Sequence, residues 1–339
     1  MKQIANASLK HLNSFSVEAR AARLLVLETE HDLQTFTDRH HFDPQRDLIL
    51  GGGSNVLFAG DVEGSVILNR VTGRKIIADS EEQVLVEACG GENWHQLVLW
   101  CLEQRLFGIE NLSLIPGLAG AAPIQNIGAY GVELGDVLHS LQALNLQTGE
   151  LHEFDHEDCQ FSYRDSRFKS ADADRYLITH IRLSLQRKFT PQLAYAGLGE
   201  ELQSMGIEQA TAKQVSDAVV RIRQRKLPDP GVTGNAGSFF KNPVVESTVA
   251  DLLKRDFKDL PVYPADNGKS KLSAAWMIDQ CGWKGHRKGD AGVSEQHALV
   301  LVNHGNASGR QLLDLANAIV ESVRSRFGVE LKPEPRIIQ

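Results

Sequence analysis

The chain has 339 residues, with 36 lysines and arginines against 43 aspartates and glutamates, which gives a formal net charge of −7. This acidic balance argues against a nucleic-acid-binding protein, because such proteins need a concentrated basic surface to neutralise phosphates. Hydrophobic residues make up 42% and charged residues 23% of the chain. These values exclude a disordered or fibrous protein, and the length predicts two or three globular domains.

Targeting and cysteine signals are weak throughout the chain. No apolar run reaches the roughly eighteen residues that span a bilayer, and the N-terminus lacks the apolar core of a signal peptide. We therefore expect a cytoplasmic protein with no membrane contact and no obligate protein partner. The cysteines lack CxxC or Cys/His ligand spacing, which predicts buried reduced thiols, no disulfide framework and no metal site: Cys89, Cys101, Cys159 and Cys281.

The first half of the chain alternates short apolar runs with glycine turns. The apolar runs predict strands over residues 24–27, 48–50, 65–69 and 84–88. Thr29 and Asp32 have the spacing of a helix N-cap, so a helix is expected from there to about His40. A second helix is predicted by one apolar stripe at offsets of three and four: Trp94, Leu97, Val98, Cys101 and Leu102.

The second half continues as a mixture of helices and strands. Residues 116–135 hold so many small residues, amides and turn formers that they predict an irregular segment that lines a site. Strands are expected over residues 141–146, around Phe161, and over 177–185 and 298–303. Helices are expected over residues 215–226, 248–255, 272–280 and 311–327, with a domain boundary between residues 185 and 215. The fold class that follows is α+β.

Two glycine-rich motifs are candidates for binding a large anion or a flat ring. Residues 48–57 read as a strand that enters the turn Gly51-Gly52-Gly53-Ser54-Asn55, and such a turn lets backbone N–H groups approach a pyrophosphate. It is not the dinucleotide fingerprint, because the third glycine would fall at Val56. A tight hairpin is the alternative for this motif, and a buried irregular connection is the alternative for residues 116–135.

Four polar positions are candidates for chemistry, and each has a plainer alternative. Arg164 stands beside Asp165, which is also typical of a local ion pair. Ser238 lies in a small-residue turn, but Phe240 replaces the second glycine of a nucleophile elbow, so the serine could simply serve its turn. The basic residues 221–226 suit a phosphate or merely a helix C-terminus. Glu334 is fixed between prolines, as in a preorganised site or an ordinary turn.

Taken in order, these motifs resemble the UDP-N-acetylenolpyruvoylglucosamine reductase (MurB, type I) family. The resemblance rests on LILGGGSNVLF, IPGLAGAAPIQNIGAYG, FSYRDSRFK, GNAGSFFKNP and the terminal KPEPR, and it covers about residues 13–336. It implies a FAD-binding domain of the vanillyl-alcohol-oxidase (PCMH) type, with subdomains at residues 1–70 and 71–215. An α+β substrate-binding domain would follow at residues 216–339.

The resemblance also implies a reaction and its reactants. NADPH would reduce a non-covalently bound FAD. The enolpyruvyl ether of UDP-N-acetylglucosamine enolpyruvate would then be reduced to UDP-N-acetylmuramate for peptidoglycan synthesis. Negative charge would develop on the substrate carboxylate, and Arg164 and Glu334 are the residues implied to stabilise it. Glu334 can donate a hydrogen bond there only when protonated, and Ser238 is implied to donate the proton to carbon.

The remaining site residues follow from the same motifs. Tyr130, Tyr195, Lys226 and Asn242 are implied to bind the substrate, and Tyr195 lies in the flexible sequence Ala-Tyr-Ala-Gly. The implied FAD contacts are Gly51, Gly52, Gly53, Ser54, Asn55, Pro116, Gly117, Gly120, Gln125, Asn126, Gly128 and Gly131. One position departs from the family pattern, because Lys332 stands where an acidic residue is expected and changes the charge near Glu334.

Two other functions remain open at this stage. A related flavin oxidoreductase could oxidise an alcohol or a 2-hydroxy acid with oxygen or a quinone, but this leaves Lys226, Ser238 and Glu334 without roles. A flavin-binding or nucleotide-sugar-binding protein without turnover would not need the set of Arg164, Ser238 and Glu334. An assay of substrate-dependent NADPH oxidation separates the three functions.

Overall fold

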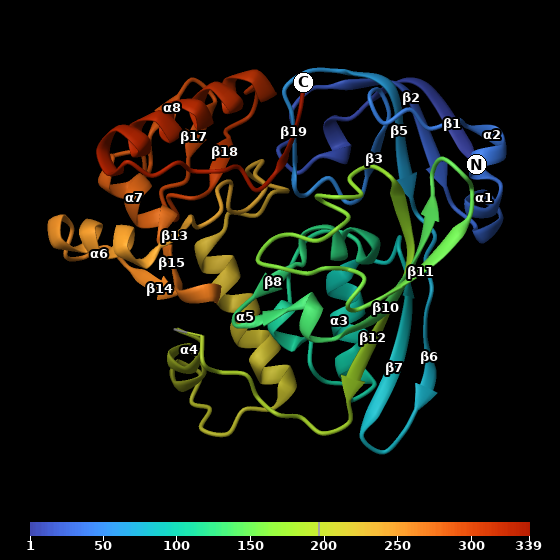
Figure 1. Ribbon diagram of the computed structural model, residues 1–339, viewed down its shortest axis with the longest axis horizontal. Helices are drawn as coiled ribbons and strands as arrows, with labels where there is room; N and C mark the ends of the chain where they lie inside the picture. Colours follow the sequence, from blue (N-terminus) through green and yellow to red (C-terminus); the bar gives the residue numbers. More distant parts are fainter. Residues whose placement is uncertain (196) are drawn as a thin grey trace. The chain divides into compact units, whose positions relative to one another are not determined.

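The computed structural model describes residues 1–195 and 197–339, which fall into two compact units (Figure 1). Unit 1 comprises residues 1–7, 21–52 and 62–223, and unit 2 comprises residues 8–20, 53–61 and 224–339. Each unit gathers segments that are far apart in the sequence. The domain boundaries expected at residues 70 and 215 stay predictions. Ala196, in the sequence around Tyr195, lies outside the described residues.

The first sheet of unit 1 has the strand order β1-β2-β5-β3 and is mostly parallel. Its strands are β1 (Lys2–Ser8), β2 (Arg20–Leu27), β3 (Leu48–Leu50) and β5 (Val62–Asn69). Helices α1 (Glu30–Gln34) and α2 (Phe36–Arg39) follow β2. The Thr29 hydroxyl accepts from Asp32 N at 3.1 Å, and the Asp32 carboxylate accepts from Thr29 N at 3.2 Å. The predicted cap is therefore confirmed.

The helix predicted to run to His40 is in fact two short helices. Thr35 separates them, because it ends α1 by donating both its N–H and its hydroxyl to the carbonyl of His31. Phe36 then begins α2 and is completely buried. The prediction of one continuous helix is wrong at this residue.

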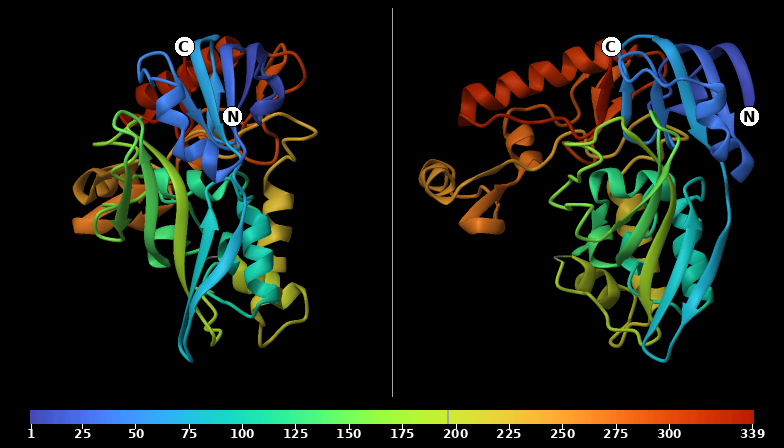
Figure 2. Two further views of the ribbon diagram at one scale, coloured as in Figure 1. Left: turned by 90° about the vertical axis from the view of Figure 1, so that its right-hand side faces the viewer. Right: turned by 45° about the vertical axis from the view of Figure 1, so that its right-hand side comes forward.

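The second sheet of unit 1 is antiparallel, with the order β11-β10-β12-β7-β6. Its strands are β6 (Arg74–Asp79), β7 (Gln83–Cys89), β10 (Leu138–Asn145), β11 (Leu151–Asp155) and β12 (Tyr176–Gln186). Helix α3 (Trp94–Glu103) lies beside this sheet (Figure 2). It buries Trp94, Leu97, Val98 and Cys101 in the same core as β7, β10 and β12. Leu102 is only half-buried at the edge of this stripe.

In this region one predicted strand is absent, and one observed strand was not predicted. The segment around Phe161 is a turn, because Ser162 and Asp165 exchange backbone hydrogen bonds of 3.1 Å. Strand β11 was not predicted, because its residues are mostly exposed and polar and only Phe154 is buried.

The long connection between α3 and β10 is irregular, as predicted. It consists of 3₁₀ turns at Glu110–Leu112, Ala119–Ala121, Pro123–Gln125 and Leu134–Asp136, and of strands β8 (Gly128–Ala129) and β9 (Val132–Glu133). After β12 follow α4 (Leu198–Ser204) and α5 (Ala212–Lys226), which share a small apolar cluster.

Unit 2 contains segments from both ends of the chain. Strands β4 (Val56–Phe58) and β19 (Arg336–Ile338) pair in parallel. A second sheet contains β16 (Arg287–Lys288), β17 (Ala291–Val293) and β18 (Leu301–Asn303). Helix α8 (Gly309–Phe327) contacts β4, β17 and β18. A strand was predicted from residue 298, but it begins only at Leu301 because His297 and Val300 close a turn.

A third sheet of unit 2 has the order β13-β15-β14. Its strands are β13 (Val244–Glu246), β14 (Val262–Pro264) and β15 (Lys269–Leu272). Helices α6 (Ser247–Asp256) and α7 (Ala274–Gln280) accompany it. The rings of Phe257, Trp276 and Phe327 pack together, which joins the ends of α6, α7 and α8. In the part of the chain that the structure describes, no helix is both long and apolar enough to cross a bilayer.

Candidate functional site

The glycines after β3 approach the glycine-rich segment, defined here as residues 116–131, at backbone distance. A Cβ atom on Gly52 would lie 2.8 Å from Gly117 Cα, and one on Gly51 would lie 2.9 Å from Ala121 Cβ. These positions admit no side chain, so two turns of unit 1 come together as bare backbone. Such a cradle fits a large anionic or flat group that must approach N–H groups closely. The predicted FAD contacts of these residues are proposals that this geometry supports.

The glycine-rich segment is braced from beneath by the second sheet. Gly120 N donates to Gly90 O at 2.9 Å, and a Cβ on Gly120 would lie 2.9 Å from the carbonyl oxygen of Ile178. Asn126 is buried with a left-handed φ of 44°, and its side-chain amide donates to Glu133 Oε2 at 2.7 Å. The amide of Asn126 therefore fixes the shape of the segment.

Arg164 is joined directly to this segment. It is half-buried and adopts a left-handed φ of 57° within the turn from Ser162 to Asp165. Its Nη2 donates to the carbonyl of Gly128 at 2.7 Å, and a Cβ on Gly128 would meet the Arg164 guanidinium at 2.9 Å. A glycine at residue 128 thus leaves the room that the guanidinium occupies.

Tyr130 and Tyr195, both predicted to bind substrate, lie side by side in unit 1. Their ring centroids are 5.2 Å apart with an edge-to-face angle of 68°. Tyr130 also packs against the cluster of α4 and α5, and its carbonyl accepts from Asn111 Nδ2 at 2.8 Å. Tyr195 is 48% exposed, so one face of this aromatic pair is open to a ligand.

Arg223 belongs to the basic residues 221–226, for which the sequence left open a phosphate or a helix C-terminus. It lies on α5, and its Nε donates to Leu114 O at 3.2 Å. Burial lowers the pKa of Arg223, the positive charge of Arg164 lowers it further, and Tyr130 acts in the opposite direction. Among the described residues no carboxylate pairs with Arg223. The positive charges of Arg223 and Arg164 lie near each other, and this pair of charges favours a bound anion.

In unit 2, Ser238 and Glu334 lie on adjacent extended segments. Glu334 N donates to the carbonyl of Phe239 at 2.8 Å, and Phe240 pairs with Pro333. Both Ser238 and Glu334 are half-buried. Phe239 and Phe240 are almost fully buried and fix this register. The structure thus brings together two of the three predicted catalytic residues, while the meeting of Arg164 with this pair stays a prediction.

The turn at Gly53, Ser54 and Asn55 continues into the same part of unit 2. Asn55 Nδ2 donates to Glu334 O at 3.4 Å, and Arg336 N donates to Asn55 O at 3.1 Å. Gly53 has a φ of 65°, and a Cβ there would overlap the carbonyl of Leu12. Lys332, the departure from the family pattern, is exposed, and its carbonyl accepts from Lys241 N at 3.0 Å.

The two other predicted substrate residues of unit 2 differ in their surroundings. Asn242 Oδ1 accepts from Ala274 N at 3.0 Å, so this side chain already serves the start of α7. Lys226 is exposed at the end of α5. It lies near His297, whose pKa is lowered first by burial and then by the charges of Lys226 and Lys284. His297 and Lys284 are further polar neighbours that no sequence motif indicated.

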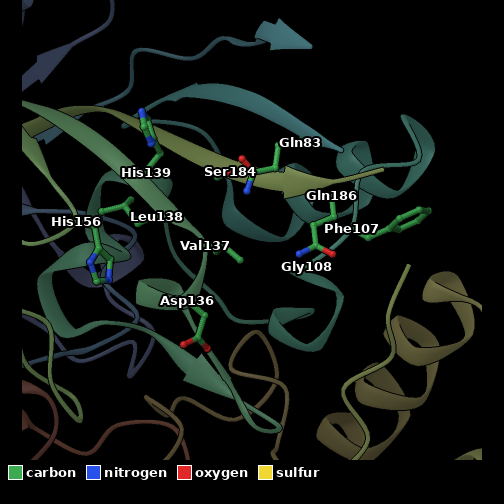
Figure 3. A pocket seen from close by; sticks show the side chains of 10 residues that line it. All are labelled: Gln83, Phe107, Gly108, Asp136, Val137, Leu138, His139, His156, Ser184 and Gln186. Carbon is green, nitrogen blue, oxygen red and sulfur yellow. The ribbon is translucent and has the colours of Figure 1, made fainter. Parts of the chain in front are cut away.

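A separate pocket of about 270 Å³ lies in unit 1 beside β10 and β12 (Figure 3). Phe107, Asp136, His139 and His156 are among its lining residues. None of the residues predicted to bind FAD or substrate lines this pocket. It is therefore distinct from the cradle and from the tyrosine pair.

Comparison with known proteins finds similarity along nearly the whole chain. Residues 229–338 match the family described as UDP-N-acetylenolpyruvoylglucosamine reductase, C-terminal domain, and residues 21–155 match the FAD binding domain. The UDP-N-acetylenolpyruvoylglucosamine reductase of Xanthomonas axonopodis pv. citri (strain 306) is 52% identical over 335 residues, which are 98% of this chain and 95% of that protein. The chain belongs to the UDP-N-acetylenolpyruvoylglucosamine reductase family.

Other members of the reductase family agree with this assignment. The protein of the same name from Pseudomonas aeruginosa is 50% identical over 332 residues and covers 98% of each chain. The crystal structure of the Thermus caldophilus reductase superposes with a TM-score of 0.66 over 100% of this chain and 98% of that one. At 23% sequence identity this second comparison supports the fold alone. The α+β fold with a FAD-binding domain and a reductase C-terminal domain is confirmed.

Proposed function

We propose that this protein catalyses the NADPH-dependent reduction of UDP-N-acetylglucosamine enolpyruvate to UDP-N-acetylmuramate, with FAD as its cofactor, in peptidoglycan synthesis. The observation that carries the proposal is the 52% identity to a reductase of this name over 98% of the chain. The set of Arg164, Ser238 and Glu334 supports it, because the rival flavin oxidases would give the last two residues no role. We further propose that the enzyme works in the cytoplasm without an obligate protein partner.

The cradle of unit 1 is where we place FAD. Gly51, Gly52 and Gly117 let two turns meet closely, and Gly120 seats the second turn on the sheet, which fits a site for the diphosphate and the ring of a flavin nucleotide. Held by these residues, FAD would supply the hydride-transfer chemistry between NADPH and the substrate. Burial raises the pKa of the Cys101 and Cys159 thiols to about 12 each, so neither is a ready nucleophile for covalent flavin attachment.

The catalytic side chains stabilise the negative charge that develops on the substrate and donate a proton to its carbon. Hydride addition leaves negative charge on the adjacent carbon and on the substrate carboxylate. Arg164 is a permanently charged planar donor, and its Nη2 is already oriented by Gly128. Protonated Glu334 would donate a second hydrogen bond to this charge. Ser238, on the segment beside Glu334, would then give its hydroxyl proton to carbon.

Substrate binding is assigned to both units. The Tyr130 and Tyr195 rings offer an aromatic surface with one exposed face. Lys226 supplies a positive charge for the diphosphate, and Asn242 supplies an amide. Arg223 adds a second guanidinium near Arg164 for the substrate carboxylate or phosphate.

The decisive experiment is an assay of NADPH oxidation by the purified holoenzyme, with and without UDP-N-acetylglucosamine enolpyruvate. We expect oxidation that depends on this substrate under anaerobic conditions, and one UDP-N-acetylmuramate formed per NADPH. A flavin oxidase would instead need oxygen or a quinone, and a binding protein would show no turnover. Flavin recovered in the filtrate after denaturation would confirm non-covalent attachment. Retention of flavin on the chain would contradict it.

A further inference from the structure

A cluster of metal-ligating side chains lies in unit 1 away from the residues assigned above. Glu30 begins α1, Cys89 ends β7 and His180 lies in β12. Their ligand atoms all lie within 4.8 Å of one another. Glu30 Oε1 lies 3.3 Å from His180 Nε2 and 3.9 Å from Cys89 Sγ. One carboxylate oxygen thus faces both a thiol and an imidazole.

The sheet register holds two of these residues in place. Cys89 and His180 are directly opposite each other in the antiparallel pair of β7 and β12. Side chains at such positions leave the same face of the sheet with Cβ atoms about 4.5–5.5 Å apart. Both are at most half-buried, and the His180 side chain is 16% exposed, so an ion can reach them from solvent. Rigid strands therefore preform two ligand positions, and the more exposed Glu30 can move onto them.

The hydrogen bonds of His180 leave its outer nitrogen available. Thr179 Oγ1 donates to the carbonyl of Gln142 at 3.1 Å, so its lone pairs are left to accept. His180 Nδ1 lies 3.2 Å from this hydroxyl oxygen and can donate to it. Without zinc, His180 Nε2 lies 3.3 Å from Glu30 Oε1 and can donate to that carboxylate. In the zinc complex the ring proton would lie on Nδ1, facing Thr179 Oγ1, and the lone pair of Nε2 would bind the ion. An orienting partner of this kind on the second ring nitrogen is typical of metal-binding histidines.

We propose that Glu30, Cys89 and His180 form a binding site for one Zn²⁺ ion, with water completing the coordination. Bond lengths of about 2.0–2.3 Å place ligand atoms of tetrahedral zinc about 3.3–3.7 Å apart, so the cluster needs only small side-chain rotations. A thiolate, an imidazole and a carboxylate suit Zn²⁺ better than Ca²⁺ or Mg²⁺, which prefer oxygen ligands. On binding, the Cys89 S–H bond is replaced by a sulfur–zinc bond and the proton leaves to solvent.

The charges of the site balance in the complex. The Glu30 carboxylate and the Cys89 thiolate together neutralise the two charges of Zn²⁺. The carboxylates of Glu30, Glu87 and Glu92 lie near the Cys89 thiol, with Lys75 as the opposing charge, and this negative surrounding attracts a cation. Glu87 is engaged with Lys75 at 3.1 Å and with Arg182 at 2.8 Å, and Glu92 with Arg74 at 3.6 Å. Glu30 is the carboxylate that faces the thiol, at 3.9 Å.

The test is Zn²⁺ binding by the FAD-loaded full chain, measured by competition with a chromophoric chelator, together with zinc-edge X-ray absorption. We expect one Zn²⁺ per chain with one sulfur in its coordination shell. Loss of a group that merely orients a ligand costs about 10–100-fold in affinity, so Cys89→Ser and His180→Gln should each weaken binding by more than about 100-fold. A shell without sulfur, or equal affinity in Cys89→Ser, would overturn the proposal.

Matched controls come from the same chain. Cys281 is a half-buried free cysteine outside the cluster, and His152 lies 3.5 Å from Glu150, also outside the cluster. Cys281→Ser and His152→Gln should both bind Zn²⁺ as the wild type does, and loss of binding in both would refute the assignment. Glu30→Gln changes a side chain that is 52% exposed, so it tests the site in a chain that keeps its packing. It should weaken binding and abolish the rise in melting temperature that Zn²⁺ gives the wild type.

Discussion

Single side chains of the candidate site depend on backbone contacts made by their neighbours. The hydrogen bond from Glu334 N to Phe239 O keeps the segments of Ser238 and Glu334 adjacent. Gly128 plays the corresponding part for Arg164, because its carbonyl orients the guanidinium and its missing side chain leaves room for it. The chemistry proposed for these residues is thus prepared by residues that take no part in it.

At Ser238 the expected defect is confined to one half of the reaction. Ser238→Ala should still allow NADPH to reduce the flavin but should slow its reoxidation by substrate about 10²–10³-fold, the usual cost of deleting one catalytic donor. Stopped-flow measurements of the two half-reactions separate these steps. Ser270→Ala, another half-buried serine of unit 2, is the control and should behave as the wild type. Equal reoxidation rates in both variants would remove Ser238 as the proton donor.

For Arg223 the prediction concerns substrate affinity. Arg223 and Arg164 are two like charges near each other, and a bound anion would reduce their repulsion. Arg223→Ala should therefore raise KM for the UDP-substrate about 10–100-fold and change KM for NADPH little. Arg223→Lys keeps the positive charge but loses the planar guanidinium, so its KM for the UDP-substrate should lie between those of the wild type and Arg223→Ala. Arg221→Ala, on the exposed face of the same helix, should leave both constants unchanged. An unchanged KM for the UDP-substrate in Arg223→Ala would refute the assignment.

Among the secondary-structure elements, two loops carry the cofactor proposal. The turn after β3 and the glycine-rich segment belong to different parts of unit 1, and Gly52 and Gly117 allow them to touch. The 3₁₀ turns and two-residue strands of the segment are too short to be rigid alone. Asn126 and the bond from Gly120 to Gly90 supply the rigidity instead.

Replacement of Gly52 tests this contact. In Gly52→Ala the new methyl group would lie 2.8 Å from Gly117 Cα, so the two loops must separate. We expect about 1–3 kcal/mol lower stability and weaker FAD binding, measured by urea unfolding and by flavin fluorescence. In Gly199→Ala, within α4, a Cβ meets nothing within 4 Å. That control should gain about 0.5–1 kcal/mol, as expected for alanine in a helix. Normal FAD affinity in Gly52→Ala would show that the contact of Gly52 with Gly117 is not part of the FAD site.

The sequence predicted those elements whose signals are local. The cap at Thr29 and the stripe on α3 depend on neighbouring residues, and the structure contains both. The prediction of a strand around Phe161 was wrong, because Ser162 and Asp165 exchange backbone hydrogen bonds and form a turn there. Strand β11 was not predicted, because it lacks an alternating apolar pattern. The sequence included Arg223 only within the basic residues 221–226, because a basic helix end does not show which of its side chains faces the site. The Glu30, Cys89 and His180 cluster has no ligand spacing in the sequence, because only strand register assembles it.

For the whole molecule, the half-buried His297 links stability to pH. Burial lowers the pKa of His297, and so do the charges of Lys226 and Lys284, whereas in the unfolded chain its pKa is about 6.5. As the pH falls below about 6.5, the unfolded chain binds a proton that the folded chain resists. Stability therefore decreases towards acid pH.

A neutral replacement of His297 should remove that dependence. Urea unfolding at pH 7.5 and pH 5.5 should show a smaller acid loss in His297→Gln than in the wild type, with a difference of at most about 1.4 kcal/mol per pH unit. The glutamine oxygen can still accept from Leu299 N, as His297 Nδ1 does at 3.2 Å. His286→Gln, at an exposed histidine of the same unit, serves as the control. Parallel acid losses in all three proteins would refute the link.

The parallel pairing of β4 with β19 has a consequence for biosynthesis. Asn55 and Glu334, bonded in the finished protein, are 279 positions apart. At about 5–20 residues per second, the ribosome completes β19 on the order of tens of seconds after β4. The nascent β4 edge, with its buried Val56, Leu57 and Phe58, must stay shielded from other chains during that interval. That interval is the time during which the unpaired β4 edge is open to pairing with other chains.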